Sequence, residues 1–121
     1  MIMNGLEAYQ NTAVTTQSKG RLVVMLYDGA IKFLKLAVKE MEANNFEVKG
    51  KYLAKAQDII FELNAVLDTE TGGEIATNLR KLYVYMNTRL NEANIKLDAE
   101  IVQEVISLLE ELNASWKAIA E

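Results

Sequence analysis

Hydrophobic residues recur at steps of three and four along most of the chain, the spacing of helices that bury one face. Ser18 is suited to cap a first helix, and Asn44-Asn45 is expected to end it. This helix is apolar around most of its girth, which favours a central position. Its inward positions are Val23, Leu26, Tyr27, Ala30, Leu34, Ala37 and Met41, with a second stripe at Val24, Ile31 and Val38.

Three further blocks have the same period. A second helix is predicted over about 47–67, followed by a break over 68–73. Thr71 and Glu74 have the spacing of a capping box, which predicts that the third helix starts there and runs to a connection at 94–97. Asp98 is expected to cap the fourth helix. The predicted inward stripe of the second helix is Tyr52, Leu53, Ala56, Ile60, Leu63 and Leu67. That of the third helix is Ile75, Leu79, Leu82, Tyr83, Met86, Leu90 and Ala93. That of the fourth helix is Val102, Val105, Leu109, Leu112, Trp116 and Ile119.

Four helices of about twenty residues with short connections predict an all-α fold, an antiparallel up-down four-helix bundle. Residues 1–17 show no sustained period, and we interpret them as an N-terminal arm or short extra helix. Residues 18–121 then form the bundle domain. The absence of proline and the presence of only six glycines agree with a helical chain. Trp116 is expected in the core.

The composition restricts the chemistry that the chain can perform. It contains neither His nor Cys, so Ser-His or Cys-His nucleophiles, thiolate or imidazole zinc sites and His-containing di-iron sites are excluded. Gly72-Gly73 lacks the Gly-Lys-Ser/Thr of a phosphate loop. We therefore expect no catalytic residue, no cofactor and no metal. An all-helical mutase of the chorismate type remains as an enzyme alternative, although Arg80, Lys81 and Arg89 lie off the apolar stripe.

Charge and hydropathy indicate where the protein works. The net charge is −4, which argues against nucleic acid and anionic membranes as partners. The longest apolar run, Leu22 to Tyr27, is too short to insert into a bilayer. No basic segment followed by an apolar run opens the sequence, so we expect a cytoplasmic protein.

Some large apolar residues fall outside the inward stripes. Phe61 shares a helical face with Gln57 and Asn64, and Tyr85 shares one with Asn78. Val84 is also off the main stripe. We predict a binding groove along the second and third helices, in which a partner helix would cover Phe61, Val84 and Tyr85. Ordinary surface exposure or a dimer contact is the alternative.

Several short motifs occur in an order and spacing that resemble the FliS family of flagellar secretion chaperones. The resemblance covers residues 6–117, with Lys19 standing where the family usually has proline. The matching residues are Ala8-Tyr9-Gln10, Met25-Leu26-Tyr27-Asp28-Gly29-Ala30-Ile31, Leu53-Ala54-Lys55-Ala56, Ile59-Ile60, Leu67-Asp68, Gly72-Gly73-Glu74-Ile75-Ala76-Thr77-Asn78-Leu79, Leu82-Tyr83, Tyr85-Met86, Leu90, Ala93-Asn94 and Trp116.

The resemblance implies a bacterial cytosolic chaperone with no enzymatic activity. It would bind the disordered C-terminal segment of flagellin, prevent premature polymerisation and pass the complex to the flagellar export gate. Leu6 and Tyr9 match positions implicated in client and gate binding. Their alternative role is to pack the arm against the first helix as a hydrophobic staple. A regulatory bundle that binds an anti-sigma factor or a co-chaperone is the rival function. Together with the groove, the expected partner-binding residues are Leu6, Tyr9, Phe61, Asn78, Val84 and Tyr85.

Overall fold

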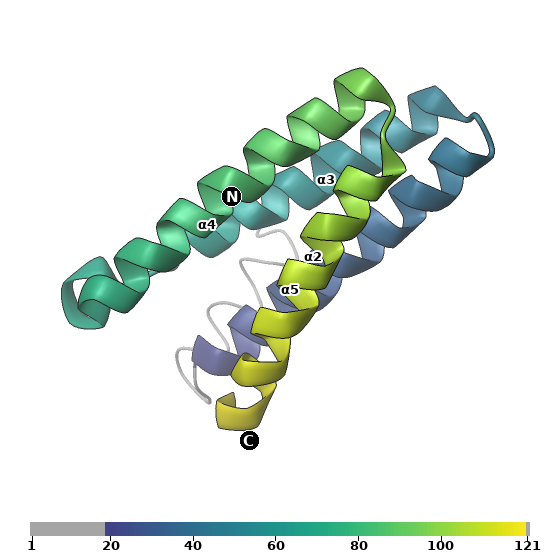
Figure 1. Cartoon of the computed structure of the whole chain (residues 1–121). Coiled ribbons are helices and arrows are strands. Elements are labelled where there is room, and N and C mark those ends of the chain that lie inside the picture. The colour runs from purple at the N-terminus through teal and green to yellow at the C-terminus, as the bar shows by residue number, and fades with distance from the viewer. Residues whose placement is uncertain (1–18, 121) are drawn as a thin grey trace, which may run out of the picture.

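The computed structural model describes residues 19–120, which form four helices and their short connections (Figure 1). The helices are α2 (Lys19–Glu42), α3 (Phe46–Ala65), α4 (Thr69–Lys96) and α5 (Ala99–Ala120). Helix α2 packs against α3 and α5, and α4 packs against the same two helices. Because the connections are short, successive helices run antiparallel, and the predicted up-down four-helix bundle is confirmed.

Two of the predicted helix boundaries are confirmed by local geometry. Helix α2 ends just before Asn44, whose φ of 61° is left-handed, a conformation that asparagine tolerates better than most residues. The carboxylate of Asp98 accepts a hydrogen bond of 3.0 Å from the backbone N–H of Glu100 at the start of α5. This is the expected cap, which satisfies a backbone donor that the first helical turn leaves unpaired.

The predicted start of the third helix was wrong. Helix α4 begins at Thr69 and is capped by Asp68, whose carboxylate accepts hydrogen bonds from the backbone N–H groups of Glu70 and Thr71. The Thr71 hydroxyl also donates to Asp68. Thr71 therefore lies inside the first turn and does not cap the helix. Because Asp68 caps α4 only three residues after the end of α3 at Ala65, the connection is shorter than predicted.

A kink at Gly73 separates this first turn from the rest of α4. Gly73 has φ 54° and ψ −128°, a combination essentially restricted to glycine. At Gly72 an added Cβ would come within 2.7 Å of the Ala76 Cβ. The glycine pair thus lets the first turn fold closely over the end of the bundle.

At its other end, α4 continues to Lys96, so the predicted connection at 94–97 was also wrong. Leu97 ends the helix in a left-handed conformation.

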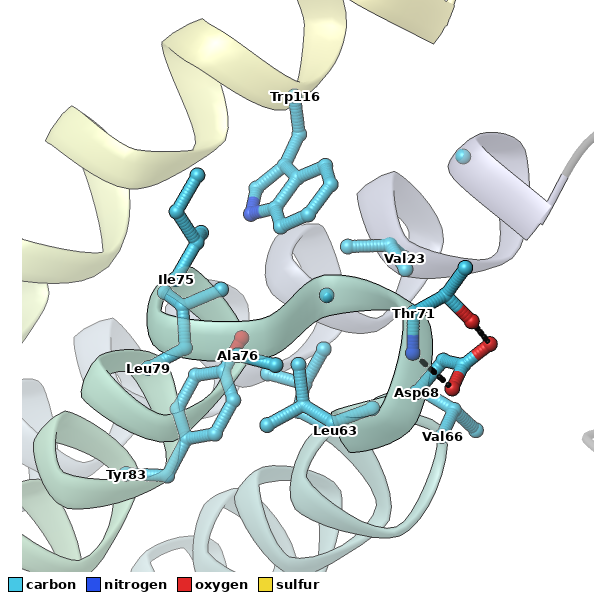
Figure 2. Close-up of a pocket in the computed structure, with 13 residues that line it drawn as sticks. Val23, Leu63, Val66, Asp68, Thr71, Ile75, Ala76, Leu79, Tyr83 and Trp116 are labelled. Carbon is cyan, nitrogen blue, oxygen red and sulfur yellow. Dashed lines mark hydrogen bonds between the residues drawn. The ribbon is translucent and has the colours of Figure 1, made fainter.

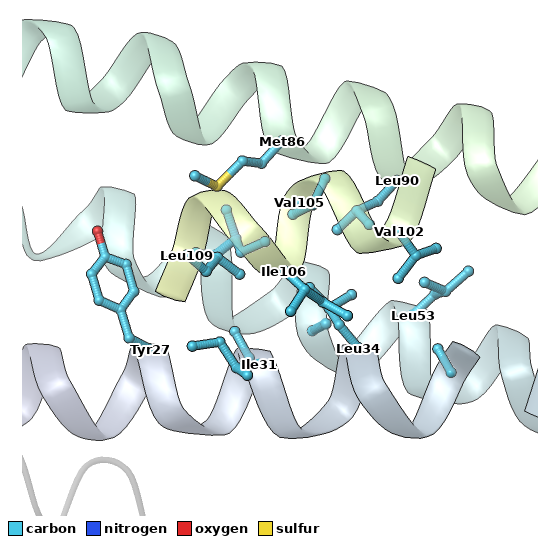
Figure 3. Close-up of a cluster of buried hydrophobic side chains, with 14 of the residues drawn as sticks. Tyr27, Ile31, Leu34, Leu53, Met86, Leu90, Val102, Val105, Ile106 and Leu109 are labelled. Carbon is cyan, nitrogen blue, oxygen red and sulfur yellow. The ribbon is translucent and has the colours of Figure 1, made fainter. Parts of the chain in front are cut away.

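The core lies between all four helices (Figure 3). Burial of apolar side chains contributes roughly 25 cal/mol for each Å² removed from water, so this contiguous cluster holds the bundle together. Lys49 is buried at the start of α3, where its ammonium donates to the side-chain oxygen of Asn94 near the end of α4. The largest fully buried side chains are Tyr27, Leu34, Leu53, Ile60, Leu63, Met86, Leu90, Val102, Val105, Ile106 and Leu109.

At one end of the bundle, predicted core positions are open to solvent. Ile75 is 74% exposed and Ile119 is 71% exposed, so their inward placement was wrong. Trp116 is only partly buried, although it does pack against the core. Figure 1 shows the reason: α4 and α5 draw apart toward the start of α4 and the end of α5. The apolar stripes continue there without an opposite helix to cover them.

Candidate partner-binding surfaces

The first surface is a cavity at this open end, which we call the end cavity. Its volume is about 310 Å³, and all four helices contribute to its wall. In Figure 2, Trp116 reaches from α5 toward the kinked start of α4, with Val23 of α2 close by and Leu63 of α3 below. Among the described residues that line it, Asp68 alone is charged, and its carboxylate is used as the cap of α4. The end cavity is therefore suited to apolar groups.

Two aromatic residues, Tyr83 and Trp116, line the end cavity, and Tyr27 contacts both of them. The hydroxyl oxygens of Tyr27 and Tyr83 lie 2.6 Å apart in a buried hydrogen bond. The rings of Tyr27 and Trp116 have centroids 6.4 Å apart and are tilted by 44°. Burial raises the pKa of Tyr27 and of Tyr83, because a phenolate away from water is unfavourable. Both phenols therefore stay neutral, and Tyr83, the one of the two that lines the end cavity, adds no charge to it.

The second surface runs between α3 and α4, and we call it the α3–α4 groove. Its volume is about 230 Å³, and within residues 19–120 no charged residue lines it. Phe61, 62% exposed, and Val84, 58% exposed, contribute to its lining from the two helices. The structure therefore brings together two of the residues predicted from their position off the apolar stripes. The full lining is Ile60, Phe61, Asn64, Tyr83, Val84, Asn87, Thr88 and Asn91.

The other predicted residues do not line this groove. Tyr85 is turned toward α5, where its hydroxyl donates to Glu104 at 3.4 Å, because adjacent helical positions differ by about 100°. Asn78 is exposed on the same face of α4, seven residues earlier. Leu6 and Tyr9 lie outside the described residues. Of the three residues expected to share one groove, Phe61 and Val84 thus line it and Tyr85 does not, and their binding of a partner stays a prediction.

Carboxamide side chains give the α3–α4 groove its polar character. The side-chain amide of Gln57 donates to the Asn91 side-chain oxygen at 2.8 Å and to the Asn87 backbone oxygen at 3.4 Å. Asn64 accepts from Arg80 at 3.3 Å. Asn87 is 8% exposed, and its side-chain oxygen has no hydrogen-bond partner within residues 19–120. Buried polar atoms are normally paired, so this oxygen is an unusual feature.

The arginines considered for an enzyme do not converge on a cavity. Arg89 forms ion pairs with Glu92 at 2.6 Å and Glu104 at 2.8 Å, and Glu92 also pairs with Lys96 at 2.7 Å. The hydrogen bond to Glu104 raises the pKa of Arg89, and hydrogen bonds from Lys96 and Arg89 lower the pKa of Glu92. Arg80 is bonded to Asn64 and exposed. In the described part of the chain, neither arginine lines the end cavity.

Sequence reasoning missed the end cavity because its residues have the pattern of a core. Val23, Leu63, Ile75 and Trp116 all fall on inward stripes, and periodicity cannot show where the opposite helix ends. One signal was present. The Gly72-Gly73 pair allows the sharp change in chain direction that the structure shows at Gly73.

The chain is thus a four-helix bundle that carries two open, mostly uncharged surfaces. Comparison with known proteins then identifies the family. The model of the family described as "Flagellar protein FliS" matches residues 2–121, and the chain belongs to this family, whose curated members are named flagellar secretion chaperones. None of the four described helices has the length and apolar character needed to span a membrane.

Three relatives show how far the similarity extends. The chain is 43% identical to the flagellar secretion chaperone FliS of Salmonella typhimurium, with 97% of this chain and 90% of the relative covered. Identity to the chaperone of the same name from Bacillus subtilis is 39%, with 96% and 86% covered. Identity to the flagellar secretion chaperone FliSB of Pseudomonas aeruginosa is 37%, with 98% and 97% covered.

Proposed function

We propose that this protein is a cytosolic export chaperone that binds the disordered C-terminal segment of flagellin. Binding prevents premature polymerisation, and the complex is delivered to the flagellar export apparatus. Membership of the FliS family supports the chaperone role. The observation that carries the proposal is the end cavity, an apolar hollow of about 310 Å³ with Ile75 largely exposed in its lining. A partly filled bundle end is a receptor for apolar side chains supplied by another chain.

Binding couples to folding of the client. The bundle is preformed, whereas a disordered segment loses conformational freedom when it binds. Ordering it costs on the order of 2–5 kcal/mol of the interaction energy, so a large interface can still release its client. Leu6 and Tyr9 stay predictions as contacts to flagellin and to the export gate.

The substitution Ile75→Glu tests this function. Ile75 contributes to the lining of the end cavity but is 74% exposed, so the change should leave the melting temperature nearly unaltered. Covering an aliphatic side chain is worth roughly 1.5–3 kcal/mol, and we expect a loss of affinity for a flagellin C-terminal peptide of about 10- to 100-fold. Isothermal titration calorimetry measures the affinity, and fluorescence of Trp116, the single tryptophan, reports on the end cavity itself.

The matched control is Ile95→Glu. Ile95 lies on the same helix, is 82% exposed and is close to the opposite end of α4. The substitution Ile95→Glu introduces the same charge far from the end cavity, so peptide affinity should remain near that of the wild type. Equal affinities for both variants would show that the end cavity does not hold the client. Failure of the wild-type protein to bind any flagellin C-terminal segment would contradict the proposed function.

A further inference from the structure

A third hollow lies between α2 and α5, two helices that pack against each other (Figure 1). We call it the α2–α5 pocket. Its volume is about 390 Å³, and none of the described residues that line it also lines the end cavity or the α3–α4 groove. Unlike those two surfaces it is highly charged, with two lysines and two carboxylates around a buried amide. The residues that matter here are Asp28, Ile31 and Lys35 of α2 and Glu110, Asn113 and Lys117 of α5.

The buried amide of the α2–α5 pocket, Asn113, has an acceptor without a donor. Asn113 is 3% exposed, and its side-chain NH₂ donates to a carboxylate oxygen of Asp28 at 2.8 Å. This bond sets the orientation of the amide, because the opposite orientation would place its oxygen against the Asp28 carboxylate. The Asn113 side-chain oxygen is closed to solvent and has no hydrogen-bond partner within residues 19–120. Since buried oxygens are normally paired, the pocket lacks an N–H donor at this point.

The two ion pairs around Asn113 leave further acceptors available. Lys35 contacts Oε2 of Glu110 at 3.2 Å, and Lys117 contacts Oδ1 of Asp28 at 3.4 Å. The second oxygen of each carboxylate makes no hydrogen bond or ion pair with any described residue. The four side chains are 50–57% exposed. Exposed pairs of this kind contribute little to stability, so both ammonium groups can move aside for a ligand.

We propose that the α2–α5 pocket binds an arginine side chain presented by a partner protein. A guanidinium group is always charged and has five N–H donors and no acceptor. It can therefore donate to the Asn113 oxygen and to the available carboxylate oxygens at the same time. Glu110 and Asn113 are separated by about 4.5 Å along α5, which one planar group with donors on several edges can span. Ile31 and Ala114 also line the pocket and offer apolar surface to the aliphatic part of the arginine.

The same groups disfavour other occupants. An anion would meet Lys35 and Lys117, but it would bring more acceptors to the Asn113 oxygen and two carboxylates. A lysine ammonium is a compact point charge, whereas the planar fork of arginine matches carboxylates with two parallel hydrogen bonds. Residues 1–18 contain neither lysine nor arginine, so the cation comes from elsewhere. The net charge of −4 attracts a positively charged segment over a longer range.

The first test is an NMR titration of the isotope-labelled wild-type protein with N-acetyl-arginine methylamide. We expect saturable shifts of the Asn113 side-chain amide and of backbone amides around it. The citrulline analogue has the same shape without the charge, and it should bind at least about tenfold more weakly. Inorganic phosphate, the anionic probe, should leave these amides unshifted. No saturable shift with the arginine probe, equal binding of the citrulline probe, or saturable shifts with phosphate would overturn the inference.

The second test compares neighbouring carboxylates on α5. Glu110→Gln should lower affinity for the arginine probe about tenfold, because a charge-assisted bond is lost. The exposed Glu110 side chain makes unfolding of this variant unexpected. The matched control is Glu111→Gln, which removes the same charge from the next residue, an exposed one that is not part of the pocket lining. Its affinity should remain that of the wild type. Equal losses for the two variants would show only a general attraction by charge and would overturn the specific site.

The third test removes the unpaired acceptor. Asn113→Leu should lower affinity for the arginine probe about tenfold, because a hydrogen bond made only in the complex is lost. The matched control is Asn87→Leu. Asn87 is 8% exposed and also has an unpaired side-chain oxygen, but it lines the α3–α4 groove, so its replacement should leave this affinity unchanged. Wild-type affinity in a folded Asn113→Leu variant would overturn the inference. If that variant fails to fold, the comparison of Glu110→Gln with Glu111→Gln decides.

Discussion

At the scale of single residues, the hydrogen bond between Tyr27 and Tyr83 ties together two helices that stand diagonally across the bundle. Helix α2 carries Tyr27 and packs on α3 and α5, while α4 carries Tyr83. Each ring is almost fully buried, with 0% and 2% exposed. Sequence periodicity correctly placed both residues inward, but it gave no sign that their hydroxyl groups meet. The contact removes the cost of burying two polar groups in an apolar core.

This pair predicts a loss of stability in alkali. Burial raises the pKa of both phenols above the ordinary value in the unfolded chain. The stabilising contribution of the pair is therefore complete below about pH 10 and is lost as the pH rises above it. The slope is about 1.4 kcal/mol per pH unit for each tyrosine that ionises only on unfolding. Urea unfolding midpoints measured from pH 8 to 11 will show this decline.

The double variant Tyr27→Phe/Tyr83→Phe is the comparison for the alkaline series. Replacing both partners by residues of similar shape should be nearly neutral at pH 7. Above pH 10 its stability should fall less steeply than that of the wild type, since lysine titration is common to both proteins. Parallel curves for the two proteins would mean that the tyrosine pair does not control alkaline unfolding.

At the scale of elements, the kinked start of α4 shapes the end cavity. Gly72, Ile75, Ala76 and Leu79 all line that cavity, and the kink at Gly73 sets how the first turn lies over it. Apart from its chain neighbours and the nearby backbone of its own helix, no described atom lies within 4 Å of a Cβ added at Gly73. An alanine there would thus meet no clash, and the obstacle to substitution is the backbone conformation alone.

We therefore expect Gly73→Ala to destabilise the protein by about 1–3 kcal/mol, the cost of a non-glycine residue in this conformation. The control is Gly50→Ala in the interior of α3, where an added Cβ also meets nothing within 4 Å. There alanine should stabilise by roughly 0.5–1 kcal/mol, because glycine loses more backbone entropy on folding. Urea unfolding measures both changes. Similar effects of the two substitutions would mean that Gly73 needs no special backbone conformation.

The elements also show how far the sequence could predict the structure. The spacing of hydrophobic residues, together with the asparagines that end a helix and the aspartate that caps one, was sufficient to predict four antiparallel helices. These features depend on residues that are close together in the sequence. Phe61 and Val84 were identifiable because an apolar residue on a polar face is visible in the sequence itself. The exposure of Ile75 and Ile119 was not predictable, since it depends on where α4 and α5 separate. The unpaired Asn87 oxygen likewise arises from the packing of α3 on α4.

At the scale of the whole molecule, the end cavity and the α3–α4 groove are neighbouring surfaces that share residues of the same two helices. Tyr83 lines both, and α3 and α4 contribute to each. An apolar hollow and a shallow amide-lined groove are suited to different stretches of a partner. A long disordered segment can occupy both surfaces at once, whereas a short peptide can occupy only one. We therefore expect the client to be held by two linked contacts.

Cutting the client segment into two synthetic halves tests this arrangement. When two weak contacts are linked, the second becomes intramolecular, and the gain in affinity is on the order of 10²–10⁴-fold. The intact flagellin segment should thus bind at least about 100-fold more tightly than either half in calorimetric titrations. Ile75→Glu should weaken one half selectively and Phe61→Glu the other, because Ile75 and Phe61 line different surfaces. If one half alone reproduces the affinity of the whole segment, or if both substitutions weaken the same half, a single surface holds the client and the two-contact arrangement is wrong.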